Sequence, residues 1–148
     1  MKITINADDQ CTETEITITC RRLSDDIEKV LAALRMSDMK LTGRKEGRDY
    51  FLEASDVIYI ESTDKHTFLY TIDKVYESPL KLYELEMKLT DRDFLRANKG
   101  CLFNINRIES IEPDFDRKLI LTMKGDLKLV VSRQYSGLVR EKLERSIS

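Results

Sequence analysis

The stretch FLRANKGCLFNINRIESI, residues 94–111, raises the question that decides the fold of this 148-residue chain. Its basic, polar segment RANKG lies between the apolar residues Phe94, on its N-terminal side, and Leu102, on its C-terminal side. The stretch contains one Gly and no Pro, which is too few for an ordinary loop. We therefore predict a connector whose ends are anchored in a hydrophobic core while its polar side chains point outward. A connector held in this way loses little entropy when it binds a partner.

The overall composition is that of an ordinary globular protein. A chain of 148 residues with 41% hydrophobic and 35% charged residues suits one domain, or one domain with a small appendage. No apolar run approaches the roughly 20 residues that a membrane span needs, and the first residues lack the pattern of a secretory signal. An odd number of cysteines without metal-ligand spacing indicates reduced thiols, namely Cys11, Cys20 and Cys101. We expect a cytoplasmic protein.

The charge distribution indicates where an anionic partner would bind. The formal net charge of -2 argues against a polycation that binds nucleic acid with its whole surface. Residues 92–148, however, contain twelve Lys and Arg against eight Asp and Glu, a net charge of +4. An anionic ligand is therefore expected at the last third of the chain.

The first 40 residues predict a small β-β-α extension. Apolar and polar residues alternate around Ile3 and Ile5 and again around Ile16 and Ile18, as expected for two strands. Residues 23–38 change to a helical period, with Ser24 in position to cap the helix. We interpret residues 1–40 as a packing, dimerisation or regulatory unit.

Residues 41–148 predict a mainly β domain with short helices at its margins. Residues 42–49 are rich in turn formers, and strands are expected within 50–54, 56–62, 66–77 and 101–113. Leu82, Leu85 and Leu89 recur at helical spacing. Residues 117–132 predict a hairpin that turns at residues 124–126. A last helix is predicted to be capped by Ser132 or Ser136 and buried through Leu138, Val139 and Leu143.

Three segments of this domain resemble the LytTR family of bacterial DNA-binding domains. They are DVIYIESTDKHTFLYT (56–71), LYELEMKLTDRDFLRANKGCLFNINRIESIEP (82–113) and KLILTMKGDLKLVVSRQYSGLVREKL (118–143). The resemblance covers roughly residues 41–145 and implies an elongated fold of several small β-sheets. In such domains the connecting loops enter successive grooves of double-stranded DNA, usually at paired direct repeats near promoters.

The resemblance also implies which residues contact DNA. The loop after the YIES strand contributes Lys65, His66 and Thr67, and the RANKG segment contributes Arg96, Asn98 and Lys99. The residues that open the last helix contribute Ser132 and Arg133, with Gln134 and Tyr135 beside them. Arg and Lys suit guanine and phosphate, and Asn suits adenine. Family members often have His and Ser where this chain has Asn98 and Gly100.

Other interpretations of these residues remain open at the level of sequence. RANKG is also compatible with an ordinary solvated turn, Arg133 with a surface residue that braces the last helix, and His66 with an exposed structural histidine. His66 is the one histidine of the chain, and no nucleophile or second metal ligand occurs at suitable spacing. We therefore predict no catalytic residue, no metal, no cofactor and no small-molecule substrate.

The sequence thus predicts a DNA-binding transcriptional regulator that is not an enzyme. The alternative is a protein-interaction module of the same fold that controls other regulators without itself binding DNA. Because only about 40 residues precede the resemblance, we expect no receiver domain, and control through expression, self-association or a partner. A homodimer formed through residues 1–40 and a small inhibitory membrane protein are two further hypotheses, the second implied by the resemblance.

Overall fold

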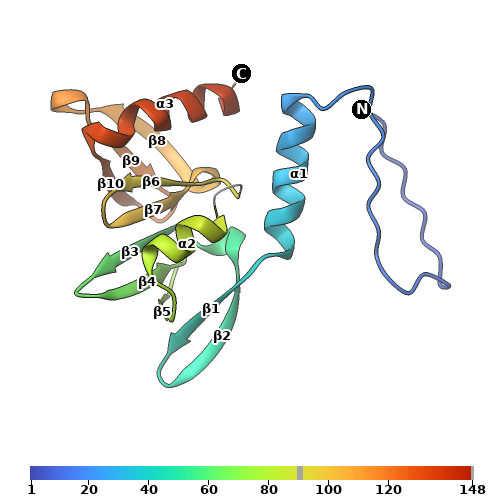
Figure 1. Cartoon of the computed structure of the whole chain (residues 1–148), viewed down its shortest axis with the longest axis horizontal. Helices are drawn as coiled ribbons and strands as arrows, with labels where there is room; N and C mark the ends of the chain where they lie inside the picture. Colours follow the sequence, from blue (N-terminus) through green and yellow to red (C-terminus); the bar gives the residue numbers. More distant parts are fainter. Residues whose placement is uncertain (90–91, 148) are drawn as a thin grey trace.

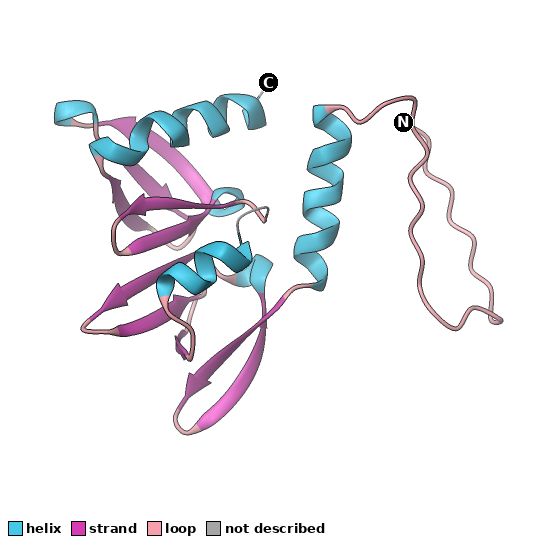
Figure 2. Cartoon of the chain, viewed as in Figure 1, coloured by secondary structure: helices cyan, strands magenta, loops and turns pink. Residues whose placement is uncertain are grey.

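A computed structural model describes residues 1–89 and 92–147, with the side chains of residues 32, 35–38 and 145–147 left out of the description. Two antiparallel sheets and three α-helices make up the body of this part of the chain (Figure 1, Figure 2). The helices are α1 (Asp25–Asp38), α2 (Leu82–Leu89) and α3 (Arg133–Ile147). This architecture confirms the prediction of a mainly β fold with short helices.

The larger sheet has seven strands in the order β2-β1-β5-β4-β3-β7-β6. They are β1 (Lys40–Lys45), β2 (Arg48–Glu53), β3 (Tyr59–Thr63), β4 (His66–Tyr70), β5 (Val75–Ser78), β6 (Phe94–Asn98) and β7 (Cys101–Asn104). The smaller sheet has the order β10-β9-β8, with β8 (Ile108–Pro113), β9 (Leu119–Met123) and β10 (Leu127–Val131). Short 3-10 turns occur at Ala54–Asp56, Ile105–Arg107 and Phe115–Arg117.

The hairpin formed by β9 and β10 confirms the predicted pairing. Leu129 lies opposite Leu121 and Val131 lies opposite Leu119. Gly125 has a φ of +91° at the turn, a conformation that glycine adopts without steric penalty. Hydrophobic alternation together with a turn residue was therefore enough to fix the register.

The prediction of a turn-rich segment at residues 42–49 was wrong. This segment belongs to the hairpin formed by β1 and β2, and the turn is restricted to Glu46 and Gly47, both with positive φ. Gly43 lies inside β1, where the strand passes close to Tyr76. A side chain does not fit there, because a Cβ at residue 43 would lie 2.7 Å from the Cβ of Tyr76. Its glycine therefore reflects close packing of two strands, and not a turn.

The two predicted N-terminal strands are not formed in the structure. Residues 1–23 contain no assigned strand and run as an arm away from the body (Figure 1). Ile3 and Ile5 are 79% and 88% exposed, and an isolated pair of strands without a hydrophobic face to pack on is only marginally stable in water. The predicted helix is confirmed as α1, and the hydroxyl of Ser24 accepts a hydrogen bond from the Ile27 amide at 3.4 Å.

Two clusters of buried side chains form the core. The first cluster joins β1, β3, β4 and α2, and includes Ile60, Leu69 and Leu85. The second cluster joins β7, the smaller sheet and α3, and includes Phe103 and Leu121. The predicted apolar face of α2 is confirmed, since its three leucines are all buried.

Helix α3 buries a narrower face than predicted. Val139 and Leu143 are buried as expected, together with Ser136. Leu138 is 56% exposed, so its prediction as a core residue was wrong. The spacing 136, 139 and 143 defines one helical stripe, and residue 138 falls outside it.

Candidate nucleic-acid interface

The RANKG segment is the tip of a β-hairpin. Residues 96–98 end β6, Lys99 and Gly100 form the turn, and β7 begins at Cys101. Phe94 and Leu102 are 4% and 1% exposed, which confirms the predicted anchoring in the core. The predicted connector is therefore a hairpin turn, and the two strands that hold it, β6 and β7, are anchored in the core.

Asn98 ties this hairpin tip to the smaller sheet. Its side-chain oxygen accepts a hydrogen bond from the Gly100 amide at 2.9 Å. Its side-chain nitrogen donates to the carbonyl of Val130, at the end of β10, at 3.2 Å. The amide that the resemblance assigns to adenine is thus engaged inside the protein.

Arg96 makes three hydrogen bonds within the protein. Its Nε and Nη2 donate to the two carboxylate oxygens of Glu86 on α2, at 2.8 and 3.4 Å, and its Nη1 donates to the carbonyl of Lys99 at 2.5 Å. Only 16% of the Arg96 side chain is exposed. Lys99 is exposed, and within residues 1–89 and 92–147 it forms no ion pair.

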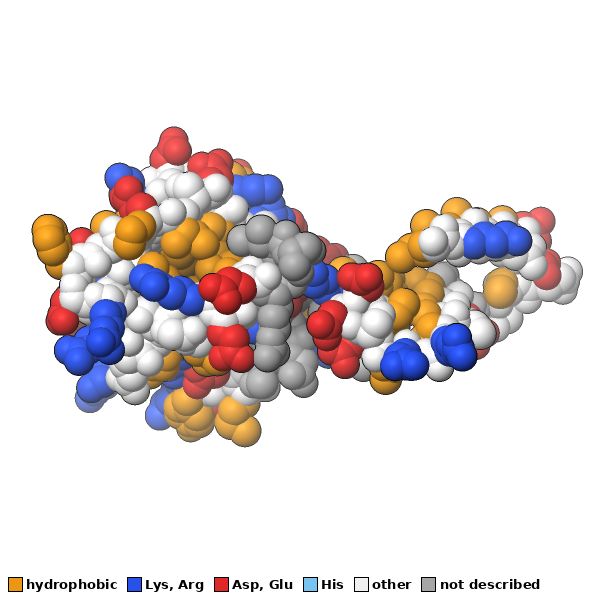
Figure 3. Space-filling view, turned by 90° about the horizontal axis from the view of Figure 1, so that it is seen from above, with side chains coloured by type: hydrophobic (Ala, Val, Ile, Leu, Met, Phe, Trp, Pro, Cys, Tyr) orange, Lys and Arg blue, Asp and Glu red, His pale blue; other side chains and the backbone are white. Residues whose placement is uncertain are grey.

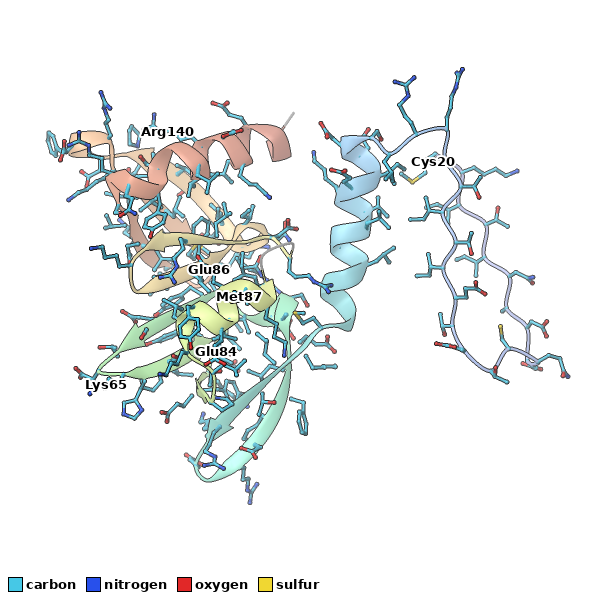
Figure 4. The ribbon with its side chains drawn as sticks, in the orientation of Figure 1. Cys20, Lys65, Glu84, Glu86, Met87 and Arg140 are labelled. Atoms are coloured by element: carbon cyan, nitrogen blue, oxygen red, sulfur yellow. The ribbon has the colours of Figure 1, made fainter. Side chains whose placement is uncertain are left out.

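The hairpin formed by β3 and β4 carries the first predicted group. Asp64 and Lys65 have positive φ at its tip, and Figure 4 shows Lys65 pointing away from the body. The exposed His66 places its Nδ1 2.5 Å from a carboxylate oxygen of Glu77. Thr67 is only 4% exposed, because alternate side chains of β4 point to opposite sides of the sheet. The structure therefore brings Lys65 and His66 to the surface, but not Thr67.

The junction of β10 and α3 carries the third predicted group. The Ser132 amide donates to the carbonyl of Ala97 in β6 at 2.8 Å, and the Ser132 carbonyl accepts from the amides of Tyr135 and Ser136, both at 3.0 Å. These bonds start the helix, which places Ser132 at its predicted N-terminal boundary, with Ser136 inside the helix. Arg133 is 62% exposed, and its Nη1 lies 3.5 Å from a carboxylate oxygen of Asp116.

Direct hydrogen bonds bring the three predicted groups to one side of the molecule. The Ser62 amide in β3 donates to the carbonyl of Gly100 at 2.8 Å, and the Ser132 and Val130 bonds connect the same hairpin to the start of α3. Ala97 lies at a β-bulge, which frees its carbonyl from the ladder between β6 and β7. In Figure 1 the tips of both hairpins and the start of α3 lie at the left end of the body, and Figure 3 shows Lys and Arg side chains at this end.

The turn between β8 and β9 adds residues that the sequence analysis did not assign to the site. Asp116 and Arg117 have positive φ there, and both Arg117 and Lys118 are exposed. The turn contacts α3, and Asp116 pairs with Arg133. The positive charge of residues 92–148 was the only sequence signal for Arg117 and Lys118. That signal did not assign them to the site, because a charge count does not show which side of the molecule a turn faces.

Two titratable groups in the larger sheet have raised pKa values. Burial, followed by the charge of Glu61, raises the pKa of the Cys101 thiol to about 12, so the thiol stays protonated at neutral pH. Burial also raises the pKa of Tyr59, whose ring stacks on that of Tyr70 with centroids 4.0 Å apart. The described residues contain no group of three or more potential metal ligands and no helix long and apolar enough to cross a membrane.

Comparison with known proteins identifies the family. The model of the LytTR family, described as the LytTr DNA-binding domain, matches residues 47–144. The transcriptional regulatory protein YpdB of Escherichia coli strain K12 is 34% identical over 90 residues, which are 60% of this chain and 37% of YpdB. The sensory transduction protein LytT of Bacillus subtilis is 33% identical over 92 residues, 62% of this chain and 38% of LytT. The chain thus spans little more than a third of the length of these relatives.

Two further matches describe the whole chain and the fold. A protein of Staphylococcus aureus described as an uncharacterized HTH-type transcriptional regulator is 26% identical over 145 residues, 97% of both chains. The solved LytTr DNA-binding domain of a putative methyl-accepting/DNA response regulator from Bacillus cereus has a TM-score of 0.67 and 26% identity, and the match covers 70% of this chain and 95% of that domain. The chain therefore belongs to the LytTR family of DNA-binding domains.

Proposed function

We propose that this protein is a transcriptional regulator that binds specific sites in double-stranded DNA with the face formed by two hairpin tips and the start of α3. One observation carries the proposal. Backbone hydrogen bonds join Ser62 to Gly100 and Ala97 to Ser132, 38 and 35 residues apart in this LytTR domain, so that Lys65, Lys99 and Arg133 lie at one end of the body. Fixed cations on a rigid frame are what groove binding requires.

The exposed residues of this face suit different parts of the DNA. Lys65 and Lys99 sit at hairpin tips and suit phosphate oxygens as flexible point charges. Arg133 follows the junction of β10 and α3, and its planar guanidinium suits the two acceptors of guanine in the major groove. The helix dipole does not favour a cation at this position, and the pair of Arg133 with Asp116 at 3.5 Å is exposed and adds little stability. Both points support a ligand-binding role for Arg133. His66 and Ser132 are placed to add further polar contacts.

Titration of the full-length protein with duplex DNA at several salt concentrations tests this function. We expect the logarithm of the affinity to fall linearly with the logarithm of salt, because bound cations release counterions from DNA. Replacing Lys99 with Ala should weaken binding to all sequences and reduce the slope by about one. Replacing Arg133 with Ala should cost ~1–3 kcal/mol at the preferred site and relax its specificity. Binding that ignores salt would refute the proposal.

Selection of bound duplexes from random DNA reports the target. A protein that binds two copies of a short site as direct repeats should select pairs of the same sequence at a fixed helical spacing. A single site, or inverted pairs, would contradict the direct-repeat part of the proposal while leaving DNA binding intact.

We place this DNA-binding activity in the cytoplasm.

We further propose that α1 and the N-terminal arm form a contact surface for a second copy of this chain. The observation behind it is an open apolar hollow between the arm and the helix, visible in Figure 3. It is lined by Ile16, Ile18, Cys20, Leu23, Ile27, Leu31 and Leu34. An apolar surface of this kind is unfavourable in water unless something covers it.

The same hollow also supports the second candidate, a protein-interaction module, with a small inhibitory membrane protein as its partner. A pull-down from membranes with the full-length protein tests this partner, with the substitution Leu31→Asp as the control that alters the hollow. Recovery of a membrane protein by both forms, or by neither, would contradict binding at this surface.

A further inference from the structure

We propose that Glu86 and Arg96 are positioning residues that hold the Lys99 turn in place for DNA, and that Arg96 is not itself a DNA contact. The inference rests on the function proposed above. It concerns how the hairpin between β6 and β7 is aimed, and it adds Glu86, a residue of α2 that the sequence analysis did not assign to the site.

The geometry links α2 to the turn through one guanidinium group. Glu86 receives two hydrogen bonds from Arg96, at 2.8 and 3.4 Å, and Arg96 donates a third to the backbone carbonyl of Lys99 at 2.5 Å. Figure 4 shows Glu86 between α2 and this hairpin. The bidentate geometry fixes the plane of the guanidinium, and the third bond then fixes the backbone that carries Lys99.

The helix that carries Glu86 is itself firmly fixed. Leu85 and Leu89 of α2 are 1% and 0% exposed in the first core cluster. The Lys81 amide donates to a carboxylate oxygen of Glu84 at 3.2 Å, which satisfies a free amide at the start of the helix. Glu86 is therefore anchored to the core, and not to a mobile loop.

Arg96 is poorly placed to contact DNA directly. Its side chain is 16% exposed, against 62% for Arg133, and its Nε and both terminal nitrogens already donate within the protein. To contact a phosphate, Arg96 would have to give up its hydrogen bonds to Glu86 and Lys99, which would leave the Glu86 carboxylate without this partner and is unfavourable. Lys99, by contrast, is exposed.

Asn98 holds the opposite side of the same turn. It accepts from the Gly100 amide at 2.9 Å and donates to the Val130 carbonyl at 3.2 Å. The turn is thus held on one side to α2 through Arg96 and on the other side to β10 through Asn98. A pre-ordered turn keeps the Lys99 side chain near its productive position before DNA arrives.

The charge of Glu86 makes the inference testable by the sign of the effect. A carboxylate near a DNA-binding face repels phosphate, so its neutralisation should strengthen binding if only long-range electrostatics matter. If Glu86 acts by positioning, the same substitution should weaken binding. Glu84 provides a matched control, because it lies two residues away and Figure 4 shows it on the other side of α2.

The experiment measures the affinity of full-length variants for one selected duplex over a series of salt concentrations. Glu86→Gln should weaken binding at least fivefold with an unchanged salt slope. Glu84→Gln should leave binding unchanged or slightly tighter, because glutamine keeps a side-chain oxygen that can accept from the Lys81 amide. Arg96→Lys, which keeps the charge but loses the bidentate geometry, should weaken binding in the same way. Circular dichroism and the melting temperature of each variant report whether the fold is retained.

A double-mutant cycle separates positioning from general structural damage. In a Lys99→Ala background, Glu86→Gln should have little further effect, because both act through the same contact. Additive losses would contradict the inference, as would tighter binding by Glu86→Gln. A salt slope lowered by about one in Arg96→Gln, which removes the charge, would show that Arg96 contacts a phosphate directly and would also contradict the inference. If the unmodified protein itself fails to bind DNA in a salt-dependent manner, the proposed function fails first.

Discussion

Arg96 and Lys99 are three residues apart, yet their surroundings differ. Arg96 is held by Glu86 in a largely buried position, whereas Lys99 is exposed at the hairpin tip. The sequence shows two cations in one short segment and cannot distinguish them. Their difference arises from Glu86 of α2, which lies ten residues before Arg96 in sequence. Helix α2 contacts β6 in the fold.

The buried thiol of Cys101 gives a prediction about alkaline pH. Its pKa is about 12 in the folded protein, whereas an exposed thiol ionises near 8.5. Between these values the unfolded chain has lost a proton that the folded chain still holds, so the free energy of unfolding should fall as pH rises above about 9. Denaturant unfolding across this range checks the result. In Cys101→Ala the fall should be shallower, and an identical profile for both proteins would contradict the assignment.

Thiol labelling offers a second measurement of the same residue. Cys11 and Cys20 are exposed, and Cys101 is buried. In the Leu31→Asp variant, whose Cys20 is not covered by self-association, a thiol reagent at neutral pH should therefore modify two of the three cysteines in the folded protein and all three in denaturant. Rapid modification of Cys101 in the folded state would show that its strand opens readily.

At the level of elements, the approach of β1 to β5 predicts a strong effect of a small substitution. A Cβ at residue 43 would lie 2.7 Å from the Cβ of Tyr76 and 3.1 Å from a methyl carbon of Leu52. Gly43→Ala should therefore force the two strands apart and cost ~1–3 kcal/mol in the free energy of unfolding, as over-packing usually does.

Gly137 supplies the control for this prediction. It lies within α3, and a Cβ there would meet no atom within 4 Å. Gly137→Ala should stabilise the protein by ~0.5–1 kcal/mol, because alanine is the better helix former. Urea unfolding of both variants gives the comparison, and destabilisation by both would point to a general sensitivity to added volume.

At the level of the whole molecule, the arm and α1 predict self-association. Ile27 and Leu31 of α1 face an open hollow, and the arm exposes Ile3 and Ile5. Sedimentation equilibrium of the full chain should give twice the monomer mass, and Leu31→Asp should return it to the monomer because a buried charge is unfavourable. Equal masses for the two proteins would remove the proposal. A chain starting at Leu41 provides an additional comparison.

The whole-molecule arrangement also explains why three short segments lie close together. The two sheets meet where β6 contacts both β10 and α3, and the hydrogen bonds of Ala97 and Asn98 cross that contact. The tips of two hairpins and the start of α3 are therefore joined by hydrogen bonds. The DNA binding that we propose for them would require little rearrangement of the backbone.

The sequence by itself determined the elements whose stability is local. The period of two with a glycine turn fixed the hairpin of β9 and β10. Helical spacing fixed the buried side of α2 and, in α3, identified Val139 and Leu143 but not the exposed Leu138. The order of motifs in residues 56–143 was enough to indicate the LytTR family, which comparison confirmed over residues 47–144.

Only the tertiary structure decided which polar residues face outward. Thr67 is buried and Asn98 and Arg96 are engaged within the protein, because their partners come from other strands and from α2. The two N-terminal segments alternate like strands, yet no strand forms there, since two isolated strands that pack on no further strand or helix are only marginally stable. Hydrophobic periodicity records what a segment would bury, whereas pairing depends on what the fold places next to it.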